Sequence, residues 1–111
     1  MRLPNAERAV VELGKLRDYS LNPEHEVGKH KARVFQAALG LTAGDAAWLR
    51  ELILGAVRGG EAEPVPVPSP FGEKYVIDIL VERGGRSAVI RTAWIVEKGT
   101  DFPRLTSCYV R

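Results

Sequence analysis

The sequence predicts an α+β fold in which two to three N-terminal helices pack on one face of a four-stranded antiparallel meander sheet. Residues 14–58 repeat apolar side chains at helical spacing, whereas residues 64–110 alternate as strands do and carry turn signals. This segregation of helices from strands is typical of an α+β fold. Because 111 residues suffice for one core, we expect a single domain, 1–111, with a helical half, 1–60, and a sheet half, 61–111.

The helical half should contain two well-defined helices. The first runs from about residue 28 to residue 39 and ends at Gly40, which suits a C-cap. The second begins at Thr42, whose hydroxyl can cap the first turn, and ends before Gly59. Ahead of both, "KLRDYSL" can form about two helical turns before "NP", and "LPNAERAVVEL" is ambiguous between a strand and a helix start.

The sheet half starts with a proline-rich segment, "EPVPVPSPFG". Proline occupies positions 64, 66, 68 and 70, and because strand amides alternate sides, all the missing donors fall on one edge. Val65 and Val67 would hydrogen-bond the other way. The pattern predicts an edge strand whose outer side is blocked against pairing with another molecule. A polyproline linker is the alternative interpretation.

A two-residue turn at "GG", residues 84–85, predicts the register of the next hairpin. Such a turn places Arg83 opposite Arg86, and counting outwards aligns the two strands. One face of the hairpin is then apolar, and on the other face Asp78 lies opposite Arg91. The apolar face pairs Tyr75 with Trp94, Ile77 with Thr92, Ile79 with Ile90, and Val81 with Ala88.

The final strand, "RLTSCYV", has a register that the sequence leaves open. Alternation directs Thr106, Cys108 and Val110 to one side and Leu105, Ser107 and Tyr109 to the other. We expect the Cys108 side to join the helices, with the cysteine as a buried, inert thiol. Ser107 and Tyr109 then share the open face of the sheet, the face without helices, with Asp78 and Arg91.

Lys31 is anomalous because it lies at the centre of the apolar face of its helix. Ala32, Val34, Phe35, Ala38 and Leu39 centre on nearly the same direction as Lys31, and a cation in the first turn opposes the helix dipole. One interpretation is a snorkelling side chain that reaches water or pairs with Glu24 or Glu26. The functional interpretation is an amine at an anion site on the rim of the sheet.

Composition narrows the classes of function. The net charge of +2 and a pI near 8.9 permit contact with polyanions without requiring it. No apolar run approaches the ~20 residues of a membrane span and no signal peptide is evident, so we expect a cytoplasmic protein without a membrane partner. We expect no cofactor and no metal, because His25 and His30 alone lack a zinc ligand set. No DNA-specific motif is present.

Four segments carry a family resemblance: "LPNAERAVV", "KLRDYSLNPEHEVGKHKARVFQAALGL", "RTAWIV" and "DFPRLTSCYV". They resemble an uncharacterised family of small bacterial domains classed as a domain of unknown function, over nearly the whole chain. A looser likeness, helices followed by a four-stranded meander, is similar to toxin domains of the barnase, EndoU, colicin and RelE type. Those domains cleave RNA on the open face of such a sheet, so the likeness implies an RNA-directed activity by analogy of fold.

RNA cleavage of this kind needs a proton carrier and fixed cations or donors around the phosphate, and no metal ion. The catalytic candidates are His30, Lys31 and Arg91, with His25 as another proton carrier. Asp78 opposite Arg91 is also readable as a cross-strand ion pair, and Arg104 as a residue that fixes its loop. The substrate-binding candidates are Asp78, Arg104, Thr106, Ser107 and Tyr109.

Three functions therefore stay open. The first is a metal-independent endoribonuclease-like or RNA-binding domain of toxin type. The second is a protein-interaction module without catalysis, either one half of a toxin–antitoxin-like pair or a homodimer. It is favoured by apolar residues that the register puts on the open face, namely Val76, Leu80, Val89 and Ile95. The third is a small structural domain without chemistry.

Overall fold

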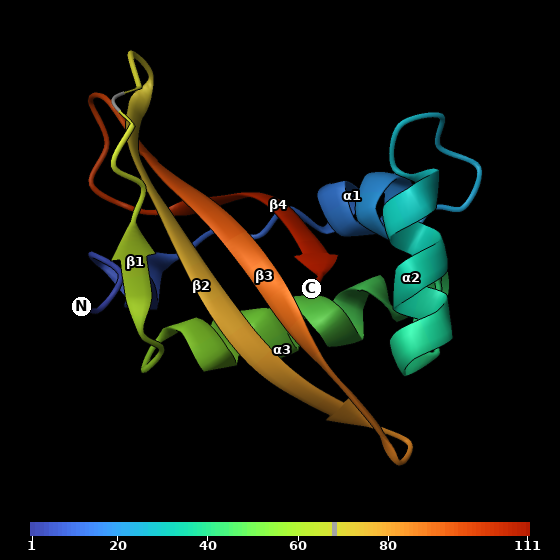
Figure 1. The fold of residues 1–111 in the computed structure, drawn as a ribbon. Coiled ribbons are helices and arrows are strands. Elements are labelled where there is room, and N and C mark those ends of the chain that lie inside the picture. The colour runs from blue at the N-terminus through green and yellow to red at the C-terminus, as the bar shows by residue number, and fades with distance from the viewer. Residues whose placement is uncertain (68) are drawn as a thin grey trace.

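The computed structural model describes residues 1–67 and 69–111 and has the expected α+β architecture (Figure 1). Three α-helices precede a four-stranded antiparallel sheet in the order β1-β2-β3-β4. In Figure 1, α3 runs behind β2 and β3, whereas α2 stands beside the end of β4. The bounds are α1 Leu13–Lys15, α2 Lys29–Leu39, α3 Ala46–Val57, β1 Ala62–Pro64, β2 Gly72–Arg83, β3 Arg86–Glu97 and β4 Arg104–Val110.

The two longer helices begin and end close to the predicted residues. Gly40 follows α2 in a left-handed conformation, φ 67°, which glycine adopts without a steric penalty. Thr42 precedes a single 3-10 turn, Ala43–Asp45, that leads into α3, and its backbone amide donates to the Asp45 carboxylate at 2.9 Å. The prediction was wrong at Val34, which lies on the exposed side of α2 and is not part of the core.

The first twenty residues contain short elements only. Residues Ala6–Arg8 form a 3-10 turn, and α1 continues into a wider π-helical turn, Leu16–Ser20. Val10 runs parallel to the start of β4: its amide donates to the Pro103 carbonyl at 2.9 Å, and its carbonyl accepts from the Leu105 amide at 3.0 Å. The N-terminal segment that could have been a strand or a helix start therefore forms one isolated parallel β-bridge, from Val10 to the outer edge of β4.

The proline-rich edge strand is shorter than predicted. Strand β1 ends at Pro64, after which Val65 still donates to the Lys74 carbonyl at 2.9 Å. Since Ala62 lies opposite Ile77, the chain must reverse direction between Val65 and Gly72. Pro66 and Pro70 therefore belong to this reversal and not to a strand, and Pro68 lies outside the described residues.

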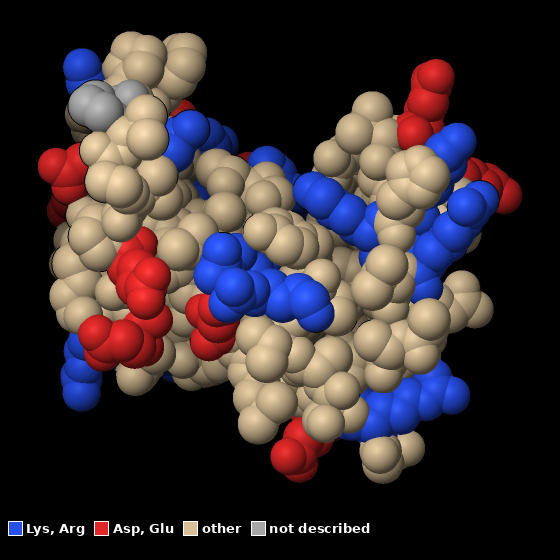
Figure 2. All heavy atoms as spheres, in the orientation of Figure 1, with Lys and Arg blue, Asp and Glu red and all other residues tan. Residues whose placement is uncertain are grey.

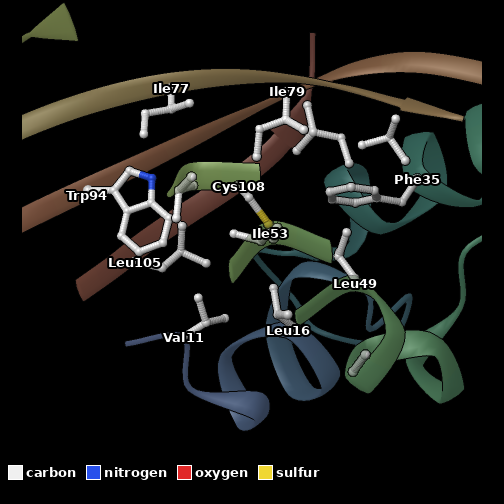
Figure 3. Close-up of a cluster of buried hydrophobic side chains, with 14 of the residues drawn as sticks. Val11, Leu16, Phe35, Leu49, Ile53, Ile77, Ile79, Trp94, Leu105 and Cys108 are labelled. Carbon is white, nitrogen blue, oxygen red and sulfur yellow. The ribbon is translucent and has the colours of Figure 1, made fainter. Parts of the chain in front are cut away.

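The β2–β3 register is the predicted one at every pair. Arg83 lies opposite Arg86 across a turn in which Gly84 and Gly85 have φ of 57° and 78°. Positive φ at both central residues is the signature of the type I′ turn that joins twisted strands. The predicted apolar face, which includes Ile77, Ile79 and Trp94, is buried against the helices (Figure 3).

Strand β4 contains a bulge that alternation did not predict. Ser107 lies opposite Ala93 but Leu105 lies opposite Trp94, so Thr106 is an extra residue in the ladder. Its hydroxyl donates to the Ala93 carbonyl at 3.1 Å. The prediction was therefore wrong for two residues: Leu105 joins the core, and Thr106 is exposed. From Ser107 onwards the residues of β4 face the predicted sides of the sheet.

The core fills the space between the helices and the buried face of the sheet (Figure 3). Cys108 is fully buried, and burial raises the pKa of its thiol to about 11, as expected of an inert cysteine. A buried polar chain crosses the sheet, because the Trp94 indole donates to the Thr92 hydroxyl, which donates to the Ile77 carbonyl, each at 2.8 Å. No helix in the described part of the chain has the length and hydropathy of a membrane span.

Candidate functional site

The Lys31 side chain lies between two tyrosine rings. Its Nζ atom is 5.5 Å from the ring centroid of Tyr19 and 5.6 Å from that of Tyr109. A cation at this distance is attracted to the electron-rich face of each ring. The described ion pairs give Lys31 no carboxylate partner, so the expected alternative of a pair with Glu24 or Glu26 is not found.

The loop before α2 holds Tyr19 in this position. The His25 ring packs edge-on against Tyr19 with centroids 4.6 Å apart, and His25 Nδ1 accepts hydrogen bonds from the amides of Val27 and Gly28, at 3.1 and 3.0 Å. A side chain at Gly28 would meet the Tyr19 carbonyl oxygen, because a Cβ atom there would lie only 2.3 Å away. His25 is thus a structural residue of the loop, which leaves His30 as the histidine beside the sheet.

A hollow opens next to Lys31 at the junction of α2 and β4. It has a volume of about 290 Å³. His30, the residue before Lys31, is exposed at this junction. Tyr109 lines the same hollow from the sheet. The residues lining the hollow are His30, Lys31, Val34, Tyr109 and Val110.

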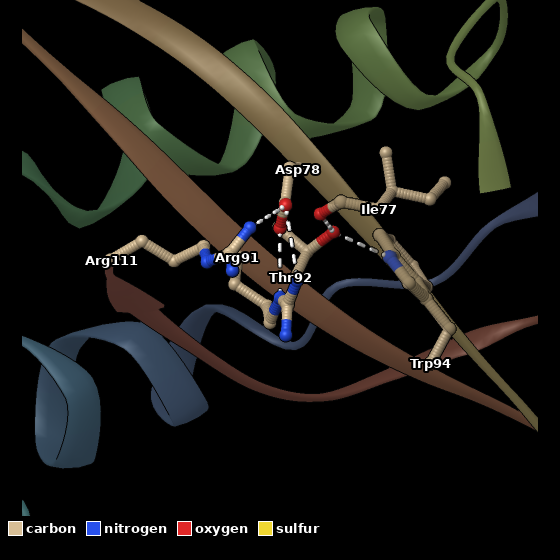
Figure 4. Close-up of polar contacts among 6 residues, drawn as sticks. All are labelled: Ile77, Asp78, Arg91, Thr92, Trp94 and Arg111. Atoms are coloured by element: carbon tan, nitrogen blue, oxygen red, sulfur yellow. Dashed lines mark hydrogen bonds and ion pairs between the residues drawn. The ribbon is translucent and has the colours of Figure 1, made fainter. Parts of the chain in front are cut away.

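The open face of the sheet carries an arginine cluster, defined as Asp78, Arg91 and Arg111 (Figure 4). Arg91 donates from Nε and Nη2 to the two carboxylate oxygens of Asp78, at 2.9 and 3.1 Å, and Arg111 donates from Nη1 to Asp78 Oδ2 at 2.6 Å. Tyr109 lies opposite Arg91 across β3 and β4, so the cluster adjoins the Lys31 site. In Figure 2, lysine and arginine side chains gather over the middle of this face and on the helices beside it.

These contacts fix the charge states within the cluster. Hydrogen bonds from Arg91, and less strongly from Arg111, hold the pKa of the Asp78 carboxyl below its ordinary value of 3.8, against the opposing effect of burial. Asp78 likewise raises the pKa of Arg91. The cluster therefore carries two positive charges and one negative charge at neutral pH, and the carboxylates of Glu61 and Glu63 line the same hollow as Asp78 and Arg91.

The remaining predicted residues are divided between this face and the far end of β4. Ser107 is half-buried on the open face, opposite Ala93. Arg104 lies at the other end of the strand, where it pairs with Glu97 and, at 3.5 Å, with Glu12. Arg104 is thus the first residue of β4 and is engaged by two carboxylates away from Lys31. Thr106 uses its hydroxyl to close the bulge.

Two residues of the site were missed from the sequence. Alternation from Ser107 and Tyr109 puts Arg111 on the open face, but its contact with Asp78 depends on the β3–β4 register, which the sequence leaves open. Tyr19 gives no such signal, since it reaches Lys31 from another element through the His25 loop. Among the described residues, no group of three or more His, Cys, Asp or Glu side chains is gathered as a metal site would require.

Asp78→Asn should make stability less dependent on acid pH. Because the folded-state pKa of Asp78 is depressed, its ionised form stabilises the fold above 3.8, its ordinary pKa, and this contribution is lost as the pH falls through the folded value. We expect the variant to be less stable than the wild type at about pH 7 and the difference to shrink towards about pH 3. Urea unfolding at both pH values measures the difference.

Glu82→Gln is the matched control for this prediction. Glu82 lies on the same strand, is exposed, and has no ion pair among the described contacts. Its substitution should change stability by less than about 0.5 kcal/mol at either pH. If the difference in free energy of unfolding between Asp78→Asn and the wild type stays constant with pH, the loss of stability in acid does not come from the arginine cluster.

Fold and site together define a class: an α+β domain whose helices cover one sheet face and whose other face carries basic side chains. The chain belongs to the family described as a domain of unknown function (DUF6883), whose family model matches residues 2–111. The expected family resemblance is thereby confirmed. No curated protein and no solved structure matched the chain, so the likeness to toxin domains stays a prediction.

Proposed function

We propose that this domain binds RNA on the open face of its sheet and cleaves it at the Lys31 site. The observation that carries the proposal is the position of the Lys31 ammonium, which is held between Tyr19 and Tyr109 without a carboxylate partner among the described ion pairs. Lys31 is half-buried and lines the hollow at the junction of α2 and β4, so its ammonium can be reached from outside. A cation held in place by neutral rings keeps its charge available for an external anion such as a phosphate.

The surrounding groups suit cleavage that uses the ribose 2′-hydroxyl. His30 takes the proton from the 2′ oxygen, which attacks the adjacent phosphorus, and the bond from phosphorus to the 5′ oxygen breaks. The Tyr109 hydroxyl gives the leaving 5′ oxygen a proton, so the products are a 2′,3′-cyclic phosphate and a 5′-hydroxyl. Lys31 stabilises the extra negative charge of the transition state. His30, Lys31 and Tyr109 line one hollow, which brings these roles together.

The arginine cluster supplies a neighbouring phosphate position. Arginine presents a planar fork of donors that matches phosphate as well as carboxylate. Asp78 now occupies the forks of Arg91 and Arg111, so an RNA phosphate at this position competes with an internal carboxylate. Because Tyr109 lies opposite Arg91, an RNA backbone held by the arginines lies close to Lys31.

The test is incubation of the purified chain with a single-stranded RNA of mixed sequence at low salt, in the presence of a metal chelator. We expect binding that weakens as salt is added, and fragments that end in a cyclic phosphate. Electrophoresis and mass spectrometry of the products detect both. Binding without fragments would overturn the catalytic part of the proposal, and the absence of binding at low salt would overturn all of it.

A protein-interaction module is the second candidate, favoured by an exposed apolar pair. Leu80 and Val89 lie opposite each other on the open face and are 65% and 37% exposed. The predicted apolar patch is smaller than expected, because Ile95 is buried and Val76 is half-buried. Light scattering at increasing concentration separates the candidates: a dimer that Leu80→Lys dissociates would favour the interaction function, and a strict monomer would count against a homodimer.

A further inference from the structure

We propose that the hollow beside Lys31 is a binding site for one unpaired nucleobase of the RNA. This inference rests on the proposed function and adds the kind of RNA that the site accepts, namely a strand with at least one base free of pairing. The base enters the hollow while the adjoining phosphate meets the Lys31 ammonium at its edge.

The lining of the hollow supports an aromatic, uncharged occupant. Val34 and Val110 contribute aliphatic surface from α2 and β4, and His30 and Tyr109 contribute rings from the same two elements. His30 and Val34 are four residues apart, one helical turn, so their side chains lie on the same side of α2. Val34 is 46% exposed, which leaves an aliphatic side chain uncovered beside a charged one.

The combination of apolar walls with one cation at the edge favours a nucleotide over other ligands. A flat base has apolar faces that stack on rings or aliphatic side chains, and the phosphate attached to it carries the negative charge that Lys31 matches. An apolar peptide side chain would fit the walls but leave the ammonium unused. A free phosphate would use the ammonium but leave the walls bare.

The accessibility of the hollow selects single strands. Within a duplex both faces of each base are covered by stacked neighbours, and only bases in loops, bulges and free strands can be splayed onto a protein surface. The hollow lies at the junction of α2 and β4, so a base enters it by leaving the stack. The arginine cluster on the adjacent sheet face then receives the neighbouring phosphates.

The test compares 2′-O-methyl RNA hexanucleotides, which lack the attacking hydroxyl, with versions in which each position in turn is abasic. Fluorescence anisotropy measures the affinity for the wild type and for Val34→Asn, which replaces an apolar wall of the hollow with a polar side chain and changes no charge. We expect one abasic position to lower the affinity of the wild type about tenfold, the effect expected of one lost stacked base. In Val34→Asn the difference between the intact and abasic strands should shrink, because the base loses an apolar wall.

Val67→Asn is the matched control, because Val67 is an exposed valine, 71% accessible, on the connection between β1 and β2. This variant should retain the wild-type sensitivity to the abasic position. If the wild type binds every abasic strand as tightly as the intact one, the nucleobase site is refuted while RNA binding stands. If no strand binds at low salt, the proposed function fails and the nucleobase site fails with it.

Discussion

Lys31→Met is expected to lower the rate of RNA cleavage by roughly 10²- to 10³-fold, the loss typical when one fixed group that stabilises transition-state charge is removed. Methionine keeps an unbranched apolar stem between Tyr19 and Tyr109 and removes only the ammonium. The fold should therefore survive, and the free energy of unfolding should change little. Single-turnover cleavage of a defined oligonucleotide measures the effect on chemistry separately from binding.

Arg33→Ala is the control that distinguishes the position of the Lys31 charge from the net charge of the protein. Arg33 lies two residues further along α2, is exposed, and carries the same charge as Lys31. A general loss of electrostatic attraction would reduce the rate equally in both variants and would be offset at lower salt. We expect a large effect for Lys31→Met only. Equal and small effects would show that Lys31 contributes to net charge and not to the reaction.

The β2–β3 hairpin was the most predictable part of the sheet, because its register depends on a short local signal. Two glycines at 84 and 85 specify one type of turn, and once Arg83 lies opposite Arg86 every later pair follows by counting. The ion pair of Asp78 with Arg91 was predictable for the same reason. The C-terminal end of α2 was likewise predictable from a local feature, since Gly40 adopts the left-handed conformation that ends the helix.

The features that escaped prediction depend on contacts between distant segments. The bulge at Thr106 allows Leu105 to pack beside Trp94, and only the assembled core requires that choice. The unusual direction of Lys31 could be seen from helical periodicity, but the rings that receive it come from Tyr19 in one segment and Tyr109 in another. A helical wheel locates an anomalous side chain; it does not identify the groups around it.

The site and the core also share structural elements, which links function to stability. Thr92 is buried on the face of β3 that the helices cover. Its neighbours along the strand lie on the open face: Arg91 belongs to the arginine cluster, and Ala93 lies opposite Ser107. Since strand side chains alternate between faces, the buried residues of β3 set where the exposed ones point. Weakening the core at β3 should therefore disturb the open face as well.

Trp94→Ala is expected to lower the free energy of unfolding by about 3–5 kcal/mol, the cost of truncating a large buried aromatic residue and leaving a cavity. Trp94 is 1% exposed and its indole nitrogen donates to the Thr92 hydroxyl at 2.8 Å. The substitution removes both the apolar burial and the hydrogen bond that orients Thr92 towards the Ile77 carbonyl. Urea unfolding followed by circular dichroism measures the change without depending on tryptophan fluorescence.

Trp48→Ala provides the comparison, because the chain contains two tryptophans in opposite environments. Trp48 is 40% exposed on α3, and its ring lies 5.0 Å from the guanidinium carbon of Arg83. An exposed contact between a cation and a ring contributes about 0.5–1 kcal/mol, so this variant should lose about that much and retain the wild-type response to RNA. Equal losses in the two variants would contradict a core in which Trp94 lies buried between Tyr75 of β2 and Leu105 of β4.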